Sequence, residues 1–137
     1  MRGYCPACSA SFEAQLIHNG FNDSRYAYCS QCGVVALCDH WSWPAGIPTS
    51  DYGPLTPEAV TRLAPCVCGG QFNTHAQPRC PECRTALDPM AATDWIQAAS
   101  SGTSHGWRWQ RSWVGLYALV IEDRMVRDPW NVASSTR

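Results

Sequence analysis

The sequence lacks lysine altogether and carries few charges: charged residues make up 15% of its 137 positions, and all ten basic residues are arginine. It has seven tryptophans and five tyrosines, so much of the surface must be apolar, stacked or buried against a partner. A disordered tail would have many charges and few aromatic residues. The composition therefore indicates a folded protein, with room for one ordinary domain or two small modules.

A long hydrophobic run is also missing. The longest, Val114 to Ile121, is much shorter than the ~20 residues that a membrane-spanning helix needs. The first residues do not resemble a signal peptide, because the ligand-like Cys5 appears with no charged and then apolar region before it. We therefore expect a soluble, cytoplasmic protein without membrane contact. In that setting, an odd number of cysteines arranged in close pairs favours metal thiolates over disulfides.

Motifs for zinc catalysis are missing as well. Catalytic zinc needs an open coordination position and a nearby carboxylate base, yet no histidine is followed two residues later by glutamate, and H-E-x-x-H is absent. A glycine-rich phosphate loop is absent too. The serine-rich stretch from Ser100 to Ser104 beside His105 fits a helix end better than an activated nucleophile. We therefore expect a protein that is not an enzyme.

Eight of the nine cysteines form four close pairs. Their spacing is C-x2-C-x20-C-x2-C followed by C-x-C-x11-C-x2-C. Zinc prefers four tetrahedral ligands, which two facing pairs supply. In chain order, the first two pairs predict one zinc site and the last two predict another. The predicted ligands of the first site are Cys5, Cys8, Cys29 and Cys32, and those of the second are Cys66, Cys68, Cys80 and Cys83.

The two sets resemble the zinc-ribbon superfamily, through Cys5-Pro6-Ala7-Cys8 with Cys29-Ser30-Gln31-Cys32-Gly33 and through Cys66-Val67-Cys68-Gly69 with Cys80-Pro81-Glu82-Cys83. The resemblance covers about the first 85 residues and implies two structural Zn²⁺ ions that hold the fold together. Ser9 and Arg84 stand where such knuckles often have glycine. Zinc ribbons occur in transcription, translation and adaptor proteins, so the superfamily by itself does not select a function.

Other interpretations of the cysteines stay open. Cys5 and Cys8 alone could form a thioredoxin-type redox pair, and a rubredoxin-like site would bind iron instead of zinc. A local metal set is also chemically possible, made of Cys29, Cys32, Cys38 and His40. The redox pair and the local set each leave two further cysteines without a role. We therefore favour two four-cysteine sites and expect Cys38 to be a small buried hydrophobe.

We expect a small α+β fold that is mostly β, with two zinc ribbons joined by a short helix. The first ribbon unit covers residues 1–45, with a hairpin that turns at Asn19-Gly20 and a third short strand from Val34 to Leu37. A connector over residues 46–64 contains the helix that bridges the two units, with Thr56 as its N-cap and Pro57 in its first turn. The second ribbon unit covers residues 65–87.

The C-terminal part is predicted to be a helix followed by a Trp-rich β-hairpin, both packed on the ribbons over residues 88–132. The helix begins at Asp88-Pro89 and ends at about Ser100. The hairpin turns around Glu122-Asp123-Arg124, and residues 133–137 form a tail. In its first strand, alternation places the tryptophans on one face.

That first strand is the candidate partner surface, made of Trp107, Arg108, Trp109, Arg111 and Trp113. Interleaved Trp and Arg can form an interface hot spot or stack nucleobases, while the alternative is that the tryptophans build a core. Two four-thiolate zinc sites, at −2 each, would take the net charge from −1 to about −5, which opposes phosphate binding. We therefore expect a non-enzymatic protein-interaction module, such as an adaptor or an immunity-type inhibitor. A nucleic-acid-binding zinc ribbon is the alternative.

Overall fold

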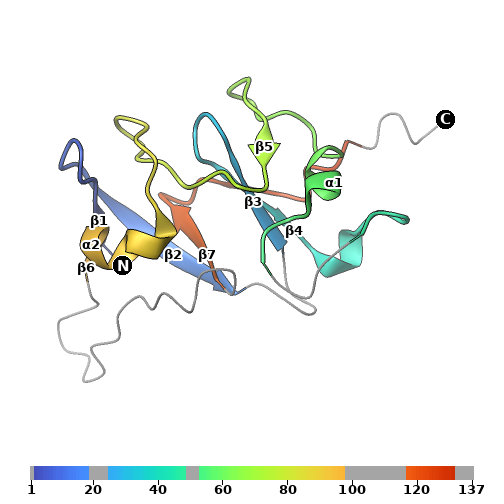
Figure 1. The fold of residues 1–137 in the computed structure, drawn as a ribbon, viewed down its shortest axis with the longest axis horizontal. Helices are drawn as coiled ribbons and strands as arrows, with labels where there is room; N and C mark the ends of the chain where they lie inside the picture. Colours follow the sequence, from blue (N-terminus) through green and yellow to red (C-terminus); the bar gives the residue numbers. More distant parts are fainter. Residues whose placement is uncertain (1, 19–24, 49–52, 98–116, 132–137) are drawn as a thin grey trace.

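The computed structural model describes residues 2–18, 25–48, 53–97 and 117–131. These residues form two four-stranded sheets, with the strand orders β6-β1-β2-β7 and β5-β3-β4-β8 (Figure 1). The first sheet consists of β6 (Ile96–Gln97), β1 (Arg2–Tyr4), β2 (Ser11–His18) and β7 (Tyr117–Ile121). The second consists of β5 (Phe72–Asn73), β3 (Arg25–Cys29), β4 (Val35–Cys38) and β8 (Met125–Arg127). The expectation of a small, mostly β protein is confirmed.

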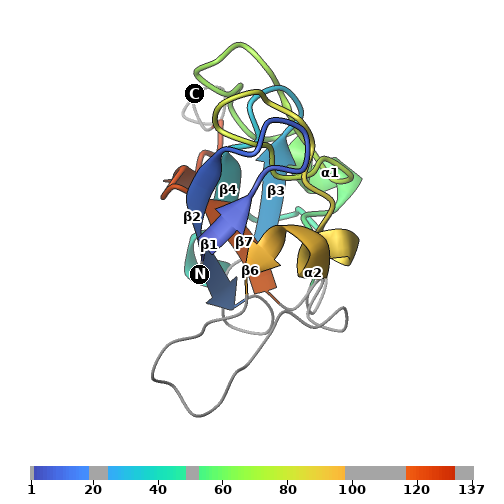
Figure 2. The same cartoon turned by 90° about the vertical axis from the view of Figure 1, so that its left-hand side faces the viewer.

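The helices are short. They are α1 (Pro57–Val60), α2 (Ala92–Trp95) and the 3-10 turns η1 (His40–Ser42) and η2 (Pro89–Ala91). Figure 2 views the molecule from the end that carries β1, β6 and α2. No helix in the described part of the chain is long and apolar enough to cross a membrane.

The predicted hairpin around Asn19-Gly20 is wrong, although both of its strands exist. β2 lies between β1 and β7, whereas β3 lies between β5 and β4 in the other sheet. All five residues of β3 are buried, so this strand is covered on both faces and lies between two neighbours. The predicted third strand is confirmed as β4, which pairs with β3 from Val35 to Cys38.

The predicted C-terminal hairpin is also wrong as a pairing. The turn is where we expected it, and Glu122 and Asp123 both adopt positive φ, at 54° and 56°. It carries the chain from one sheet to the other: β7 pairs antiparallel with β2, and β8 pairs parallel with β4. Residues 118–121 are buried on both faces, so β7 is covered by the core of the second sheet as well as by its own. The Trp-rich first half of the predicted hairpin, residues 107–113, lies outside the described residues.

The two predicted helices differ in outcome. The N-cap of α1 is confirmed, since the Thr56 hydroxyl accepts a hydrogen bond from the backbone N–H of Ala59 at 3.2 Å. However, α1 packs into the core of the second sheet through the buried Ala59 and does not bridge two units. The helix predicted from Asp88 to Ser100 is too long. It ends at Trp95, because the buried, β-branched Ile96 is extended and pairs with Gly3 of β1.

A shared core joins the two sheets. Its buried members come from β3, β4 and β7, and they are Tyr26, Tyr28, Val35, Leu37, Ala118 and Val120. The Tyr28 hydroxyl donates to the carbonyl oxygen of Leu119 and accepts from its N–H, both at 2.9 Å. Because β7 has β2 on its other side, this hydroxyl satisfies backbone groups that the sheet itself leaves unpaired.

Two candidate metal centres

The structure gathers eight cysteines into two groups of four, and within each group the sulfur atoms all lie within 4.8 Å of one another. The outer centre consists of Cys5, Cys8, Cys80 and Cys83, and the inner centre of Cys29, Cys32, Cys66 and Cys68. The predicted grouping in chain order is therefore wrong. The first pair meets the last pair, and the second meets the third, so neither group lies within one of the predicted ribbon units.

Strand pairing and burial explain this nested arrangement. Cys5 and Cys80 are buried in the core of the first sheet, beside Phe12 and Leu87. The inner centre is assembled at the end of β3, where Phe72 of β5 pairs with Cys29. Any two facing pairs can complete a tetrahedron, so the cysteine spacing alone does not choose between partners. The apolar residues around each pair make that choice.

The three C-x-x-C pairs form the same knuckle. In each, the residue before the second cysteine donates its backbone N–H to the sulfur of the first cysteine at 3.3–3.4 Å; the donors are Ala7, Gln31 and Glu82. The residue after the second cysteine donates its N–H to the first cysteine's carbonyl oxygen at 2.9–3.1 Å; these donors are Ser9, Gly33 and Arg84. Such N–H groups stabilise a thiolate.

The residue that closes each knuckle needs a left-handed backbone. Ser9 and Arg84 both have φ of 67°, and Gly33 has φ of 80°. Ser9 and Arg84 thus adopt the conformation for which such knuckles often use glycine. The shorter C-x-C pair turns differently: Gly69, with φ of 96°, donates its N–H to the Cys66 carbonyl oxygen at 2.9 Å.

The sulfur spacing fits a four-thiolate metal site. Across the outer centre, Cys5 Sγ lies 3.6 Å from Cys83 Sγ and Cys8 Sγ lies 3.7 Å from Cys80 Sγ. The corresponding distances in the inner centre are 3.5 Å and 3.6 Å. A tetrahedron with metal–sulfur bonds of about 2.3 Å has edges of about 3.8 Å, whereas a disulfide bond is about 2.05 Å long. All eight cysteines are free, so each group could hold one metal ion with four ligands.

The sulfurs differ in burial and in protonation. Burial raises the pKa of the Cys66 thiol to about 12. In contrast, hydrogen bonds from the Thr85 hydroxyl and backbone lower the pKa of the exposed Cys83 to about 6, and the Gly70 N–H lowers that of the exposed Cys68 to about 7. Each centre therefore has one sulfur that is readily available as a thiolate near neutral pH. Thr85, whose Oγ1 lies 3.1 Å from Cys83 Sγ, belongs to no motif that would mark it in the sequence.

Cys38 lies outside both groups. It is fully buried in the core of the second sheet, and its pKa is raised to about 12 by burial and by the Asp128 carboxylate. Cys29 and Cys32 face Cys66 and Cys68 instead. The expectation of a buried Cys38 is confirmed, and neither of the two groups found among the described residues includes Cys38.

The two centres adjoin each other. Gly33, directly after Cys32, packs so closely on Arg79, directly before Cys80, that a Cβ on Gly33 would lie 2.5 Å from the Arg79 backbone nitrogen. Figure 1 shows the four cysteine-bearing loops along one edge of the molecule. Between Cys66 and Cys68, Val67 is fully exposed on this edge.

The candidate partner surface cannot be located in the described part of the chain. Trp107, Arg108, Trp109, Arg111 and Trp113 fall outside the described residues, so their role as a partner surface stays a prediction. Among the described residues, the large exposed apolar side chains are Trp41, Val67, Met90 and Tyr4.

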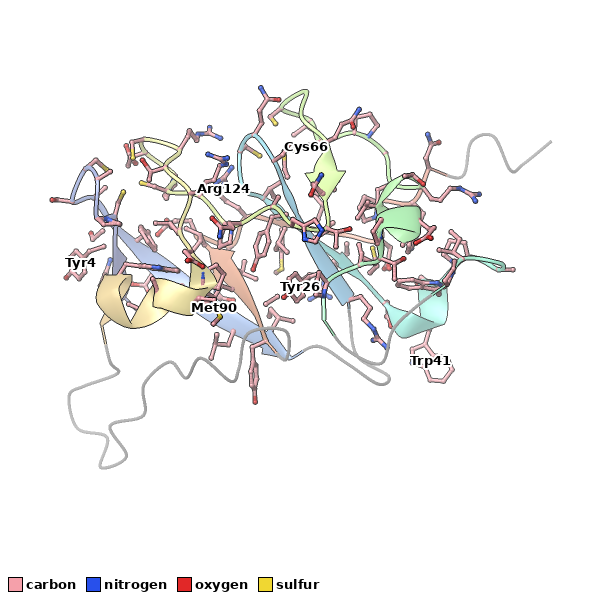
Figure 3. All side chains as sticks on the ribbon, in the orientation of Figure 1. Tyr4, Tyr26, Trp41, Cys66, Met90 and Arg124 are labelled. Carbon is pink, nitrogen blue, oxygen red and sulfur yellow. The ribbon has the colours of Figure 1, made fainter. Side chains whose placement is uncertain are left out.

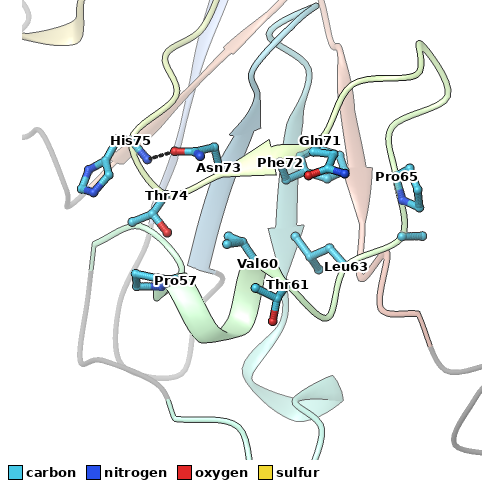
Figure 4. Close-up of a pocket in the computed structure, with 11 residues that line it drawn as sticks. Pro57, Val60, Thr61, Leu63, Pro65, Gln71, Phe72, Asn73, Thr74 and His75 are labelled. Carbon is cyan, nitrogen blue, oxygen red and sulfur yellow. Dashed lines mark hydrogen bonds between the residues drawn. The ribbon is translucent and has the colours of Figure 1, made fainter.

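A separate cavity of about 540 Å³ opens between α1 and β5 (Figure 4). Val60 and Leu63 form its apolar part, while Asn73, Thr74 and His75 make it polar at one end. The Asn73 side chain already has a partner nearby, because its oxygen accepts a hydrogen bond from the backbone N–H of His75 at 2.8 Å. No cysteine lines this cavity, so it is separate from both centres.

No curated protein and no solved structure matches the chain. A match to a described family covers residues 2–88, which is more than half of the chain. This segment contains every cysteine of both centres. The chain therefore belongs to the family described as a domain of unknown function, DUF8255.

Proposed function

We propose that the protein binds two structural zinc ions, one in each centre, and that these ions hold its two sheets in place. The observation that carries this proposal is the closed donor set: four cysteine sulfurs surround each site at tetrahedral spacing. Structural zinc sites have this composition, and a catalytic site would keep one position open for water or substrate. Four thiolates also suit iron, as in rubredoxin-like sites. The identity of the metal is therefore the first quantity to measure.

Native mass spectrometry with elemental analysis of the purified full chain tests this proposal. We expect two zinc ions per chain and no colour. One metal or none in a folded preparation would contradict the two-site proposal, and a red, iron-containing protein would contradict zinc. The apo protein should lose tertiary structure, because structural zinc contributes on the order of 10 kcal/mol to small metal-dependent folds.

We further propose that the zinc-stabilised fold is a non-enzymatic module that binds another protein. The closed centres leave no coordination position for a substrate, and apolar side chains are presented to solvent at Trp41 and Val67, which are 79% and 101% exposed. Exposed aromatic and apolar groups are typical of protein interfaces. An adaptor or an inhibitor would both fit this character.

Capture of partners from the source cell, followed by binding to Trp107→Ala and Arg108→Ala, tests the interaction and its location. Lost affinity at an unchanged melting temperature would place the interface on the Trp-rich segment. A large drop in melting temperature for Trp107→Ala would assign that residue to the core. Tight binding to oligonucleotides that weakens steeply with salt would instead favour the nucleic-acid alternative.

A further inference from the structure

A second cavity, of about 480 Å³, lies where the two centres adjoin. Cys66 and Cys68 of the inner centre border it, and so does Arg84, which closes a knuckle of the outer centre. Its remaining wall is largely apolar and includes Val34, Val67, Met125 and Val126. The volume is in the range of sites that bind small molecules or single side chains.

Arg124 supplies a guanidinium to this cavity, whose lining also includes the Asp123 carboxylate and the Arg84 guanidinium. Arg124 Nη1 is buried with no hydrogen-bond partner among the described residues. The ion pair that joins Arg2 and Glu13 does not involve Arg124.

An unpartnered buried guanidinium nitrogen requires an explanation. Arg79 Nε is also unpartnered, but of these two arginines it is Arg124 that lines the cavity, where an anionic ligand would give it a partner. Figure 3 shows Arg124 between the loop of Cys66 and the loop of the Cys80–Cys83 knuckle.

The turn before Arg124 is held rigidly. Glu122 and Asp123 are both in the left-handed region, which is unfavourable for residues other than glycine. The turn is fastened to β2, because Glu122 N–H donates to the Glu13 carbonyl oxygen at 2.9 Å and the Glu122 carboxylate accepts from the Glu13 N–H at 2.6 Å. Asp123 also accepts from the Gln15 side chain. These bonds fix where the Arg124 backbone enters the cavity wall.

The charges around the cavity restrict the kind of anion. With zinc bound, each four-thiolate centre carries a charge of about −2, so this reasoning rests on the proposed function. The Asp123 carboxylate, which also lines the cavity, adds to this negative charge. A phosphate dianion would therefore be repelled more strongly than a carboxylate, which has a single charge. A guanidinium also matches a carboxylate with two parallel hydrogen bonds. The apolar wall beside Arg124 requires, in addition, an apolar group close to the carboxylate.

We propose that this cavity binds the C-terminal carboxylate of a polypeptide partner, together with the apolar side chain of its last residue. In a C-terminal residue, the carboxylate and the side chain are attached to the same Cα. One residue can therefore contact the guanidinium and the apolar wall at the same time. In an internal aspartate or glutamate, the side chain itself carries the carboxylate, so the residue has no apolar side chain to contact the wall. Arg124 binds the carboxylate, and Val67 and Met125 contact the side chain.

The test uses the zinc-loaded full chain and two synthetic peptides that end in leucine, identical except that one has a free carboxylate and the other a C-terminal amide. Titration followed by NMR of the labelled protein should show saturable binding of the acid, with shifts at Arg124 and Val67. The amide should bind at least about tenfold more weakly. Arg124→Gln should weaken binding of the acid peptide to the same degree. Arg62→Gln, an exposed arginine outside the cavity, should bind like the unaltered chain.

Equal affinity for the acid and the amide, or no saturable binding of the acid, would overturn the proposal without any variant. Acetate should compete with the acid peptide better than inorganic phosphate does. If phosphate competes as well as acetate at the same concentration, the choice of a carboxylate is overturned. Metal content is measured in the same samples. Two zinc ions without peptide binding refute this inference alone, whereas fewer than two zinc ions in the folded chain refute the proposed function. If Arg124→Gln loses zinc and the unaltered chain ignores the acid, Arg124 only balances the charge of the centres.

Discussion

The outer and inner centres both have four cysteine ligands but are built differently. The sulfur contacts of the outer centre join residues 72 and 78 positions apart, and those of the inner centre join residues 34 and 39 positions apart. This twofold difference in loop length changes the loop-closure free energy by only about 0.6 kcal/mol. Burial differs more: the outer centre exposes Cys8 and Cys83, and the inner centre exposes only Cys68. We therefore expect burial, and not loop length, to set which centre is more labile.

Loss of one ligand should have the largest effect. Cys80→Ser should release the outer metal and Cys29→Ser the inner one, each with loss of native structure around its own sheet, because metal binding contributes on the order of 10 kcal/mol. Native mass spectrometry and thermal melting measure both effects. Cys38→Ala is the control, and it should keep two metals because Cys38 belongs to neither centre.

The outcome also tests the nested grouping. Alkylation of Cys80→Ser should modify Cys5, Cys8 and Cys83 and spare the inner cysteines. If Cys66 and Cys68 become reactive while Cys5 and Cys8 stay protected, the grouping in chain order would be correct and the structure wrong.

The contact between the centres can be broken at Gly33. Gly33 and Gly46 have nearly the same φ, 80° and 82°. Gly33 packs against Arg79, whereas none of the described residues lies within 4 Å of a Cβ on Gly46. Gly46→Ala should therefore lower the free energy of unfolding only through the unfavourable positive φ, by about 1 kcal/mol. Gly33→Ala should lose several kcal/mol, because the backbone of Arg79 must move. Denaturant unfolding of the zinc-loaded variants measures the difference, and equal losses would mean that the centres do not touch.

The link between the two sheets can be weakened at Tyr28. Tyr28→Phe removes a hydroxyl that bonds both the N–H and the carbonyl oxygen of Leu119 in the core. We expect a loss of about 1–3 kcal/mol in the free energy of unfolding, since these buried groups lose their partner. Tyr4→Phe, at an exposed position, should change little. A separate unfolding transition for each centre in Tyr28→Phe would show that the hydroxyl couples them. A loss no larger than that of Tyr4→Phe would contradict this role.

The smallest expected effects concern how readily each centre releases its metal. Under a mild chelator, the outer centre should lose its metal first because two of its sulfurs are exposed, and mass spectrometry after alkylation would identify Cys8 and Cys83. Metal content should fall as the pH drops, since each thiolate must be protonated to leave the metal. The Thr85 hydrogen bond lowers the pKa of Cys83 to about 6, so the contribution of this thiolate is lost as pH falls through that value.

Thr85→Val should accordingly move the midpoint of outer-metal release slightly upward in pH, while that of the inner metal stays where it is. Thr61→Val, at an exposed threonine outside both centres, is the matched control. A downward shift, or an equal shift of both midpoints, would contradict the role of the Thr85 hydroxyl.

The local features of the fold could be predicted from short stretches of residues. The N-cap and first-turn proline predicted α1, the knuckle pattern pointed to the eight cysteines, and Glu122-Asp123 marked the turn between β7 and β8. These features depend on residues within about four positions of one another, where backbone preference and side-chain chemistry act directly. The burial of Cys38 could be expected too, because it follows an apolar run.

Which strands pair and which cysteine pairs meet could not be predicted in this way, because both depend on the packing of distant segments. Asn19-Gly20 and the alternation beside it indicated a hairpin, yet β2 and β3 belong to different sheets. Likewise, the cysteine spacing allowed more than one grouping, and the nested one follows from Phe12 and Leu87 around one pair and Phe72 around another. Pairing of distant segments depends on the apolar surface that each can bury, which adds up over the whole core and is not encoded in any single motif.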